Sequence, residues 1–292
     1  MIPSEVRERL GLSSDGERPI DIRVRRMDFD FPDDTPEFWF DGDPFLTLYY
    51  AGFSATLPDG EKMFIRAVRN FQDQIHDPVL RAEIQAFVGQ EAQHAKGHEV
   101  LNRFMTKRGY SVDVIEKEAR AAVRWSQKHM SKAQQLANTV CAEHFTALMA
   151  DYFLSKVPED LDTVDERVRP IWAWHILEEA EHKAVAFDVY KATVDDTALL
   201  RRTMAVTTVL FAVTSGIGAL RLLSESGKLR DPRLWTRTVR RFLSPTSFVP
   251  QMWRDYLDFY RSDYHPWQHD NREAIAAFRA KYLREPARAA AA

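Results

Sequence analysis

A glutamate followed three residues later by a histidine occurs twice in this 292-residue chain, each time inside a long stretch of helical pattern. Glu91 and His94 form the first pair, and Glu179 and His182 form the second, with His175 four residues before Glu179. On a helix, side chains three or four residues apart share one face. Each motif therefore presents a carboxylate and an imidazole in one direction, and a fold that uses both motifs must bring two helices together.

The rest of the chain also favours helices. Apolar residues at three- and four-residue spacing begin after the turn-like sequence LPDG, and glycine is nearly absent from the long stretches that follow. Neither a strand-like alternation of useful length nor an internal repeat of 20–50 residues is visible. We therefore predict an all-α fold. The expected helices are 60–76, 78–108, 128–156, 165–196, an apolar helix at 203–220, 231–243, 249–260 and 270–285.

The first 58 residues are rich in proline, aspartate and aromatic residues, which favours irregular structure. We expect an N-terminal arm at 1–58 that packs on the core and contains one short helix at 44–55. A four-helix bundle at 59–197 then carries the Glu-x-x-His motifs. The helical extension at 198–292 is expected to form one compact domain with this bundle.

Composition excludes several classes of protein. The 40 Lys and Arg residues nearly balance the 43 Asp and Glu residues, and 45% of the residues are hydrophobic, which argues against a disordered chain and against a dedicated nucleic-acid binder. Cys141 is the single cysteine, and the N-terminal residues lack the apolar core of a secretory signal. These features predict a cytoplasmic protein with no internal disulfide.

One segment bears on membrane contact. Residues 203–220 carry no charge, and they lie between Arg202 and Arg221. Eighteen residues is the lower limit of a membrane-spanning helix, and the Thr, Ser and Gly content makes the segment only mildly apolar. We expect a helix buried in the protein rather than embedded in a membrane, with peripheral membrane contact as the alternative.

The two motifs indicate a metal site. Two Glu-x-x-His motifs, together with one glutamate from each of two further helices, form the ligand set of ferritin-like dinuclear carboxylate proteins. Glu143 is one candidate, because its helix is otherwise apolar and a buried carboxylate is costly unless it is paired or binds a metal. Glu61 is the other, although a first-turn acid facing the helix dipole is a plain alternative. The longest interval, between Glu91 and Glu143, suits the crossover of a ferritin-like bundle.

A third histidine extends this set. His175 lies on the same helical face as the second motif and is expected to be an added ligand, with His98 as the competing candidate. His144 points about 100° away from Glu143, and His129 lies ~21 Å from it if their helix is continuous. Other nearby groups are given lesser roles: Glu178 and Glu181 face solvent or support a ligand, Asp188 orients a ligating imidazole, and His265 and His269 lie in a loop.

The chain resembles a bacterial family known as "predicted metal-dependent hydrolase", which is placed near the ferritin-like proteins. The resemblance rests on LPDGEKMFIRAVR, FVGQEAQHAKGHEVLN, AEHFTALMADYFL, WHILEEAEHKAVAFDVY and YHPW, which span about residues 57–267. It implies a ferritin-like four-helix core, additional C-terminal helices and a metal site.

The order of the motif residues is also similar to that of the di-iron arylamine N-oxygenases of the p-aminobenzoate N-oxygenase type. Those enzymes carry an extra histidine one turn before the last Glu-x-x-His, a place that His175 takes here. This second resemblance implies the type of site and a capacity for oxygen chemistry, without the arylamine substrate. The ligands that we predict are Glu61, Glu91, His94, Glu143, His175, Glu179 and His182.

Carboxylate and imidazole ligands suit iron or manganese better than a metal that prefers thiolates. We predict two iron ions, with manganese or a mixed Mn/Fe pair as alternatives. Glu91 and Glu179, or Glu143, would bridge the ions, and His94, His175 and His182 would be terminal ligands. The leading functional hypothesis is an oxidoreductase that uses O₂ and an electron donor to oxidise an organic, lipophilic substrate, with no catalytic residue beyond the ligands. The alternative is a hydrolase that uses a metal-bridging hydroxide, and iron storage ranks third. A homodimer is compatible with the sequence.

Overall fold

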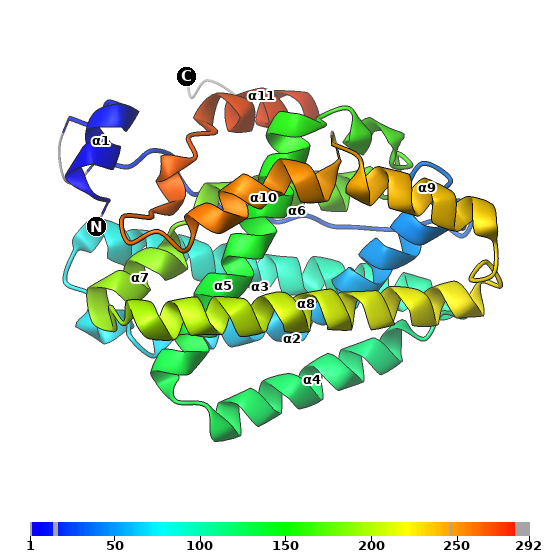
Figure 1. Ribbon diagram of the computed structural model, residues 1–292, viewed down its shortest axis with the longest axis horizontal. Coiled ribbons are helices and arrows are strands. Elements are labelled where there is room, and N and C mark those ends of the chain that lie inside the picture. Colours follow the sequence, from blue (N-terminus) through cyan, green and yellow to red (C-terminus); the bar gives the residue numbers. More distant parts are fainter. Residues whose placement is uncertain (1, 14–16, 246, 284–292) are drawn as a thin grey trace, which may run out of the picture.

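The computed structural model describes residues 2–13, 17–245 and 247–283, and throughout these ranges the regular structure is helical (Figure 1). The described residues form no strand, and the only β-type pairing among them is one isolated bridge between Phe40 and Val164. The predicted all-α fold is confirmed. The helices are α1 (Ser4–Leu10), α2 (Pro44–Arg69), α3 (Pro78–Lys107), α4 (Val112–His129), α5 (Lys132–Asp151), α6 (Arg169–His182), α7 (Val185–Thr193), α8 (Thr197–Glu225), α9 (Pro232–Leu243), α10 (Phe248–Asp258) and α11 (Arg272–Tyr282).

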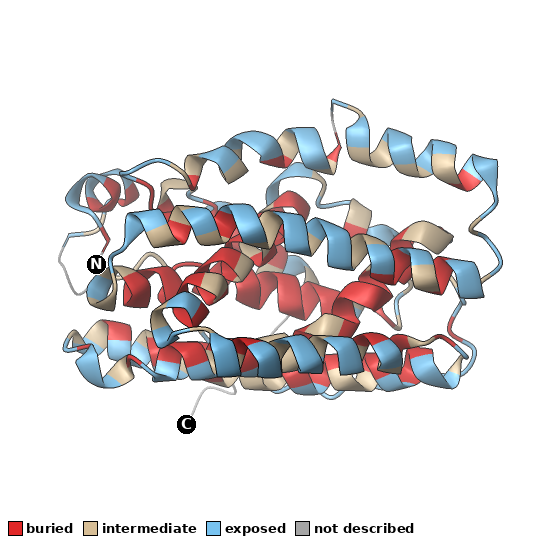
Figure 2. Ribbon diagram, turned by 60° about the horizontal axis from the view of Figure 1, so that its bottom comes forward, coloured by how far each residue is buried: buried red, intermediate tan, exposed pale blue. Residues whose placement is uncertain are grey.

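The centre of the molecule is formed by α2, α3, α5 and α6, each of which contacts others of the group. Helix α5 crosses the direction of α2 and α8, and α8 lies along α2 on the outside (Figure 1). Buried residues gather on the central helices, whereas the outer helices show long exposed stretches (Figure 2). Helix α6 is the extreme case, because every residue from Ile171 to His182 is buried. Its charged side chains therefore need partners inside the protein.

Helix α2 contradicts the expected turn at LPDG. One continuous helix replaces the predicted pair at 44–55 and 60–76, and it passes through Pro58. A proline inside a helix cannot donate to the carbonyl four residues earlier, which here belongs to Ser54. Asn102 of α3 supplies the missing donor, since its Nδ2 lies 3.2 Å from the Ser54 carbonyl oxygen. The helix continues because a neighbouring helix replaces the lost hydrogen bond, and the expected boundary at residue 58 falls inside α2.

Two other predicted helices are divided. The expected helix 128–156 begins only at Lys132, because Ser131 and Gln134 form a capping box that starts a new helix after α4. The expected helix 165–196 is interrupted after His182, and α7 starts at Val185. Helix α4 itself, which the sequence pattern did not identify, covers α2 and α3.

Helix α8 contradicts the expected burial of 203–220. Its most apolar 18-residue window has a mean hydropathy of 1.7, yet only 22% of that window is buried. By length and composition it is the one helix among the described residues that is apolar enough to cross a membrane. Its inner side packs on α2 and α5, and its outer side is open.

A candidate metal centre

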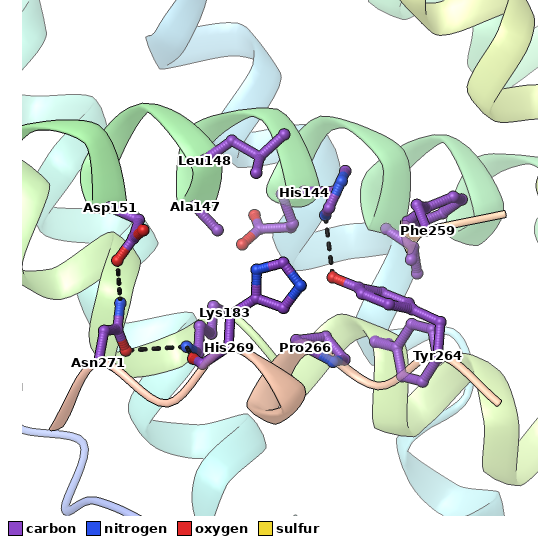
Figure 3. Close-up of a pocket in the computed structure, with 13 residues that line it drawn as sticks. His144, Ala147, Leu148, Asp151, Lys183, Phe259, Tyr264, Pro266, His269 and Asn271 are labelled. Carbon is purple, nitrogen blue, oxygen red and sulfur yellow. Dashed lines mark hydrogen bonds between the residues drawn. The ribbon is translucent and has the colours of Figure 1, made fainter. Parts of the chain in front are cut away.

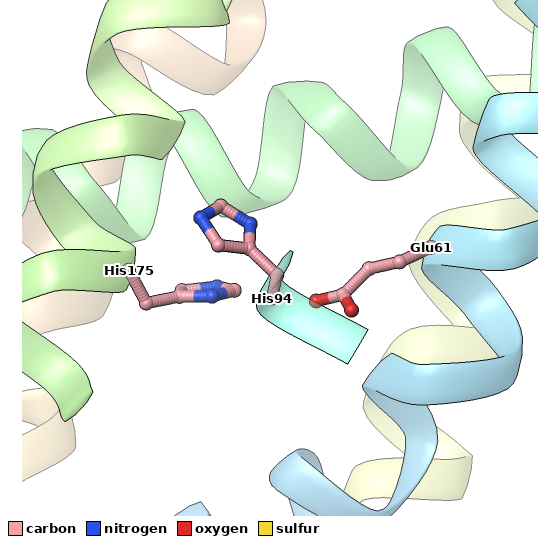
Figure 4. A group of neighbouring side chains, drawn as sticks. All are labelled: Glu61, His94 and His175. Carbon is pink, nitrogen blue, oxygen red and sulfur yellow. The ribbon is translucent and has the colours of Figure 1, made fainter. Parts of the chain in front are cut away.

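Seven buried side chains from four helices converge at the middle of the molecule. Three overlapping groups each contain ligand atoms that lie within 4.8 Å of one another: Glu61, His94 and His175; Glu91, His94 and Glu179; and Glu91, Glu143 and His182. Figure 4 shows the first group, in which residues of α2, α3 and α6 approach a common point. Together the groups contain all seven residues that the motif spacing predicts. The structure therefore brings these residues together, while their role as ligands stays a prediction.

The two oxygens of Glu179 face different parts of the cluster. Oε1 lies 3.6 Å from His94 Nδ1 and 3.4 Å from His175 Nε2. Oε2 lies 3.4 Å from His182 Nε2, which is also 3.2 Å from Glu143 Oε2. Glu179 thus stands between a side that contains His94 and His175 and a side that contains His182. If metal ions bind in this cluster, Glu179 would be placed to contact ions on both sides.

The side chains in the cluster have unsatisfied polar atoms, which are costly in a buried site. Both carboxylate oxygens of Glu61, Glu91 and Glu143 lack a hydrogen-bond partner among the described residues. The inward-facing nitrogens of the histidines, Nδ1 of His94 and Nε2 of His175 and of His182, also lack one. Cations bound between these atoms would satisfy all of them at once. The donor set therefore fits a metal centre.

The acids of the cluster repel one another. Burial and the neighbouring carboxylates raise the pKa of Glu61 and Glu91 well above the usual glutamate value. Burial also raises the pKa of Glu143, to about 7. Glu179 is the exception, because His182 and His175 lower its pKa even though burial acts in the opposite direction. Four adjacent carboxylates cannot all ionise without cations, which a pair of divalent metals would supply.

The histidines differ in protonation. Burial lowers the pKa of His94 and of His175 to about 3, so both are neutral at pH 7. Burial also disfavours the charged form of His182, but Glu179 and Glu143 raise its pKa well above the ordinary value. His94 and His175 are thus already in the neutral form that binds metals. His182 instead favours the protonated form, because Glu179 and Glu143 lie beside it.

An outer layer of residues contacts the far side of each imidazole. His182 Nδ1 forms a hydrogen bond with Gln90 Oε1 at 2.9 Å, and His175 Nδ1 forms one with His98 Nε2 at 3.1 Å. His94 Nε2 lies 3.1 Å from Glu178 Oε2, a contact that lacks hydrogen-bond geometry. Such partners fix the orientation and tautomer of ligating histidines. His98 is therefore behind His175 rather than in the cluster, and Ser54 Oγ occupies its other nitrogen at 2.9 Å.

Comparison with known proteins gives one match. The model of the family described as "predicted metal-dependent hydrolase" matches residues 23–270. The chain belongs to this family. No curated protein and no solved structure gives a significant match. The family resemblance expected from the sequence is confirmed, and the match to a metal-dependent family agrees with a cluster of buried glutamates and histidines. The resemblance to the arylamine N-oxygenases has no such support.

The family match begins at residue 23, within the N-terminal arm that the sequence predicts only to pack on the core, and it includes Arg25. The Arg25 guanidinium bonds Glu178 Oε1 at 3.1 Å and both oxygens of Glu181 at 2.8 Å. Arg279 of α11 donates to Glu181 Oε1 at 2.8 Å, and Gln90 Nε2 donates to Glu181 Oε2 at 3.0 Å. Glu178 and Glu181 are thus buried rather than solvated, and they connect the histidine layer to the N-terminal arm.

Sequence reasoning missed Arg25 and Gln90. The available signal for Arg25 was the run of three glutamates on an otherwise apolar helix, which requires a buried cation. Gln90 gives no such signal, because a glutamine beside a ligand is also common on a solvated helix face.

The other acidic and histidine side chains singled out from the sequence lie outside the cluster. His129 ends α4, so the assumption that it shares a helix with Glu143 is wrong. His144 Nδ1 lies 3.1 Å from the hydroxyl of Tyr264. Asp188 Oδ1 lies 3.0 Å from His265 Nε2, so its imidazole partner is not a predicted ligand. His265 and His269 lie outside the α-helices, on either side of the short turn Pro266–Gln268, as the loop prediction requires, and His265 is buried.

Two small pockets reach the centre in this member of the family. One lies between α5 and the segment around Pro266 and measures about 30 Å³, enough for one or two water molecules (Figure 3). Glu143 lines it, with a polar wall that includes His144, Lys183, Tyr264 and Asn271. The other pocket measures about 20 Å³ and touches His175 and Glu179. Its remaining walls are mostly apolar. The cluster is therefore bordered by one polar pocket and one apolar pocket.

Proposed function

We propose that the seven clustered residues hold two metal ions and that the chain is a metal-dependent enzyme at this centre. The observation that carries the proposal is the set of buried donor atoms without hydrogen-bond partners, arranged in three overlapping groups. One ion needs fewer donors than four carboxylates and three imidazoles provide. The N/O donor set favours iron or manganese, as in ferritin-like dinuclear proteins.

The positions of the side chains suggest their tasks. Glu179, with one oxygen on each side, would bridge the two ions, and Glu91 is the second bridging candidate because its Oε1 lies 3.3 Å from His182 Nε2 and 3.8 Å from His94 Nδ1. Glu61 would bind the ion beside His94 and His175, and Glu143 would bind the ion beside His182. Gln90, Glu178 and His98 would fix the orientations of the His182, His94 and His175 rings, respectively.

We propose hydrolysis as the reaction, because the description of the family names it. Two bound metals would supply a Lewis acid and an activated water molecule. The polar pocket at Glu143 supports this proposal, since it is large enough for water and lies beside the cluster. The Lys183 ammonium, which has a third N–H beyond its bonds to the His269 carbonyl and to Asn271 Oδ1, would offer a hydrogen-bond donor to an oxygen of a substrate there.

Oxygen chemistry is the second candidate, and a different observation favours it. The cluster is rich in glutamate, is fully buried, and has an apolar pocket against His175 and Glu179. With reduced iron bound, such a centre would supply electrons to O₂. The apolar pocket would then admit O₂ or the end of a lipophilic substrate, and an electron donor would be required.

One experiment tests both levels of the proposal. The protein is loaded with Fe²⁺ without oxygen, or with Mn²⁺ or Zn²⁺, and the bound metal per chain is measured. Two ions per chain are expected, with loss in Glu143→Ala and in His182→Ala and retention in His129→Ala. Oxygen-independent cleavage of an ester panel supports hydrolysis, and reductant-dependent oxygen uptake by the iron form supports oxidation instead. A chain that binds no stoichiometric metal contradicts the whole proposal.

A further inference from the structure

The outer side of α8 is an apolar surface. Its exposed large residues are between 43% and 62% accessible and repeat at three- and four-residue spacing, so they lie on one face. They are Val206, Val209, Leu210, Val213, Ile217 and Leu220. No charged residue interrupts the helix between Arg202 and Arg221. A continuous apolar face of this length marks a contact surface.

Helices α9 and α10 extend this surface. Val239 and Leu243 on α9, and Val249, Trp253 and Leu257 on α10, are each at least 44% exposed. We call these residues, together with the six on α8, the apolar face. A cavity of about 580 Å³ lies between α8, α9 and α10, with α2 and α5 as its floor. Aromatic and aliphatic side chains form nearly all of its wall, and its volume falls in the range of small-molecule sites.

Basic residues border the apolar face. Arg233 and Arg240 are exposed on α9, and Arg254 is exposed beside Trp253; none of the three forms an ion pair with a described residue. Residues 197–258 contain ten Lys and Arg against four Asp and Glu, in a chain whose formal net charge is −3. Apolar side chains next to arginines are typical of helices that lie in the surface of an anionic membrane.

The packing of α8 against the protein shows that this helix is not a membrane-spanning segment in the structure. Helix α8 contacts α2 and α5 on its inner side, so it lies flat against the protein instead of crossing a bilayer alone. A second copy of the chain fits the surface less well. A two-fold dimer through the same face would bring together two surfaces that each carry more Lys and Arg than Asp and Glu, and these surfaces repel each other.

We propose that the apolar face rests on an anionic lipid bilayer and that the cavity binds an acyl chain taken from it. The cavity opens on this face, because Val239, Leu243, Val249 and Trp253 belong both to its wall and to the exposed surface. A chain entering from the bilayer therefore stays in apolar surroundings throughout.

The cavity also leads towards the metal centre. Met149 of α5 lines both the cavity and the small apolar pocket that touches His175 and Glu179. The flexible Met149 side chain therefore forms part of the wall between the cavity and the pocket beside the cluster. The substrate class that follows is a lipid-like molecule with its tail in the cavity, and this last step rests on the proposed function.

Membrane binding is tested with the full-length protein and vesicles, by co-sedimentation. Binding to mixed phosphatidylglycerol and phosphatidylcholine vesicles is expected, with weak binding to phosphatidylcholine alone. Val213→Glu is expected to weaken binding at least about tenfold, because the variant places a charge where Val213 would contact the apolar part of the bilayer. Val114→Glu on α4, another exposed valine, is the matched control and should change little. Arg233→Ala should weaken binding to the anionic vesicles about fivefold and reduce its dependence on salt.

Occupancy of the cavity is tested separately with the fluorescent fatty acid cis-parinaric acid. Gly216 lines the cavity, and a Cβ built on it meets no atom within 4 Å, so Gly216→Phe fills space without a clash at its base. Gly216→Phe should weaken the binding of the fatty acid at least about tenfold, whereas Gly216→Ala, which also removes the glycine but adds only one methyl group, should retain it. Thermal unfolding of both variants shows whether they fold.

The outcomes are distinguishable from those of the metal experiment. Neither assay needs a metal, so both are repeated with Glu143→Ala. If vesicle binding is absent, or if Val213→Glu binds like the parent, the membrane proposal is wrong even when two metals are bound. If Val213→Glu instead converts a dimer into a monomer in solution, the apolar face is an interface between copies. Fatty-acid binding that Gly216→Phe leaves unchanged overturns the cavity assignment.

Discussion

The side-chain amide of Asn102 donates to the Ser54 carbonyl, the acceptor that Pro58 leaves without its helical partner. The contact joins α2 to α3 one turn away from His98, whose Nδ1 is bonded to the same serine's hydroxyl. The helix that carries Glu61 therefore depends on a residue of the helix that carries Glu91 and His94. The break in the α2 hydrogen bonds and the cluster of predicted ligands therefore depend on the same contact between α2 and α3.

Asn102→Ala is expected to destabilise the protein by about 1–3 kcal/mol, because it leaves a buried carbonyl unpaired. Pro58→Ala restores the N–H that α2 lacks. In the Pro58→Ala background the cost of Asn102→Ala should therefore fall, and a double-mutant cycle in urea measures the difference. Equal costs in both backgrounds would show that Asn102 acts only through its bonds to Ser54 Oγ and Glu116.

Gln90→Leu is expected to weaken metal binding about 10–100-fold, because it removes the oxygen that holds His182 Nδ1. Chelator competition measures the affinity, and Lys96→Ala, an exposed position on the same helix, is the control. The ligands themselves are untouched in this variant. An unchanged affinity would mean that His182 is oriented by the acids alone.

Metal binding is expected to release protons and to strengthen as the pH rises. In the metal-free protein, the raised pKa values of Glu61, Glu91 and His182, and that of Glu143 at about 7, keep protons in the cluster at neutral pH. Each bound metal displaces them, so protons compete with metal and lower pH weakens binding. Calorimetry in buffers of different ionisation enthalpy counts the released protons. A count of zero would contradict the protonation of the cluster described above.

Arg25→Ala is expected to destabilise the metal-free protein by about 3–5 kcal/mol, since it leaves Glu178 and Glu181 buried with less compensation. Arg279 still contacts Glu181, which places the expected cost at the lower end of this range. Arg26→Ala, at the exposed neighbouring position, should cost little. Denaturant unfolding compares the two variants, and similar free energies of unfolding would show that the contacts of Arg25 do not stabilise the fold.

The seven clustered residues could be predicted because helical periodicity itself places them. Glu91 and His94 must share a face once their segment is helical, and the same holds for Glu179 and His182. The cost of a buried carboxylate then singles out Glu143. No knowledge of the packing of α3 against α6 was needed to choose these residues, although only the structure shows that they meet.

The turn predicted at LPDG is wrong and Arg25 was missed because both depend on contacts between residues that are far apart in the sequence. Pro58 and Gly60 carry a turn signal, and the residue that overrides it, Asn102, lies 48 positions from Ser54. Arg25 reaches Glu178 across 153 positions. The exposure of Val213 and its neighbours could not be predicted either, because hydropathy does not distinguish a surface that faces the protein from one that faces outward.

Helix α6 is held at its sides and its end by segments from opposite ends of the chain. Arg25 contacts Glu178 and Glu181 from the N-terminal arm, and Lys183, directly after His182, donates to the His269 carbonyl and to Asn271 Oδ1 near the C-terminus. Segments from both terminal regions of the chain therefore fix the position of α6. A fragment limited to the four central helices would contain every predicted ligand but would lack Arg25, His269 and Asn271. We expect α6, with its buried Glu178 and Glu181, to lose its position in such a fragment.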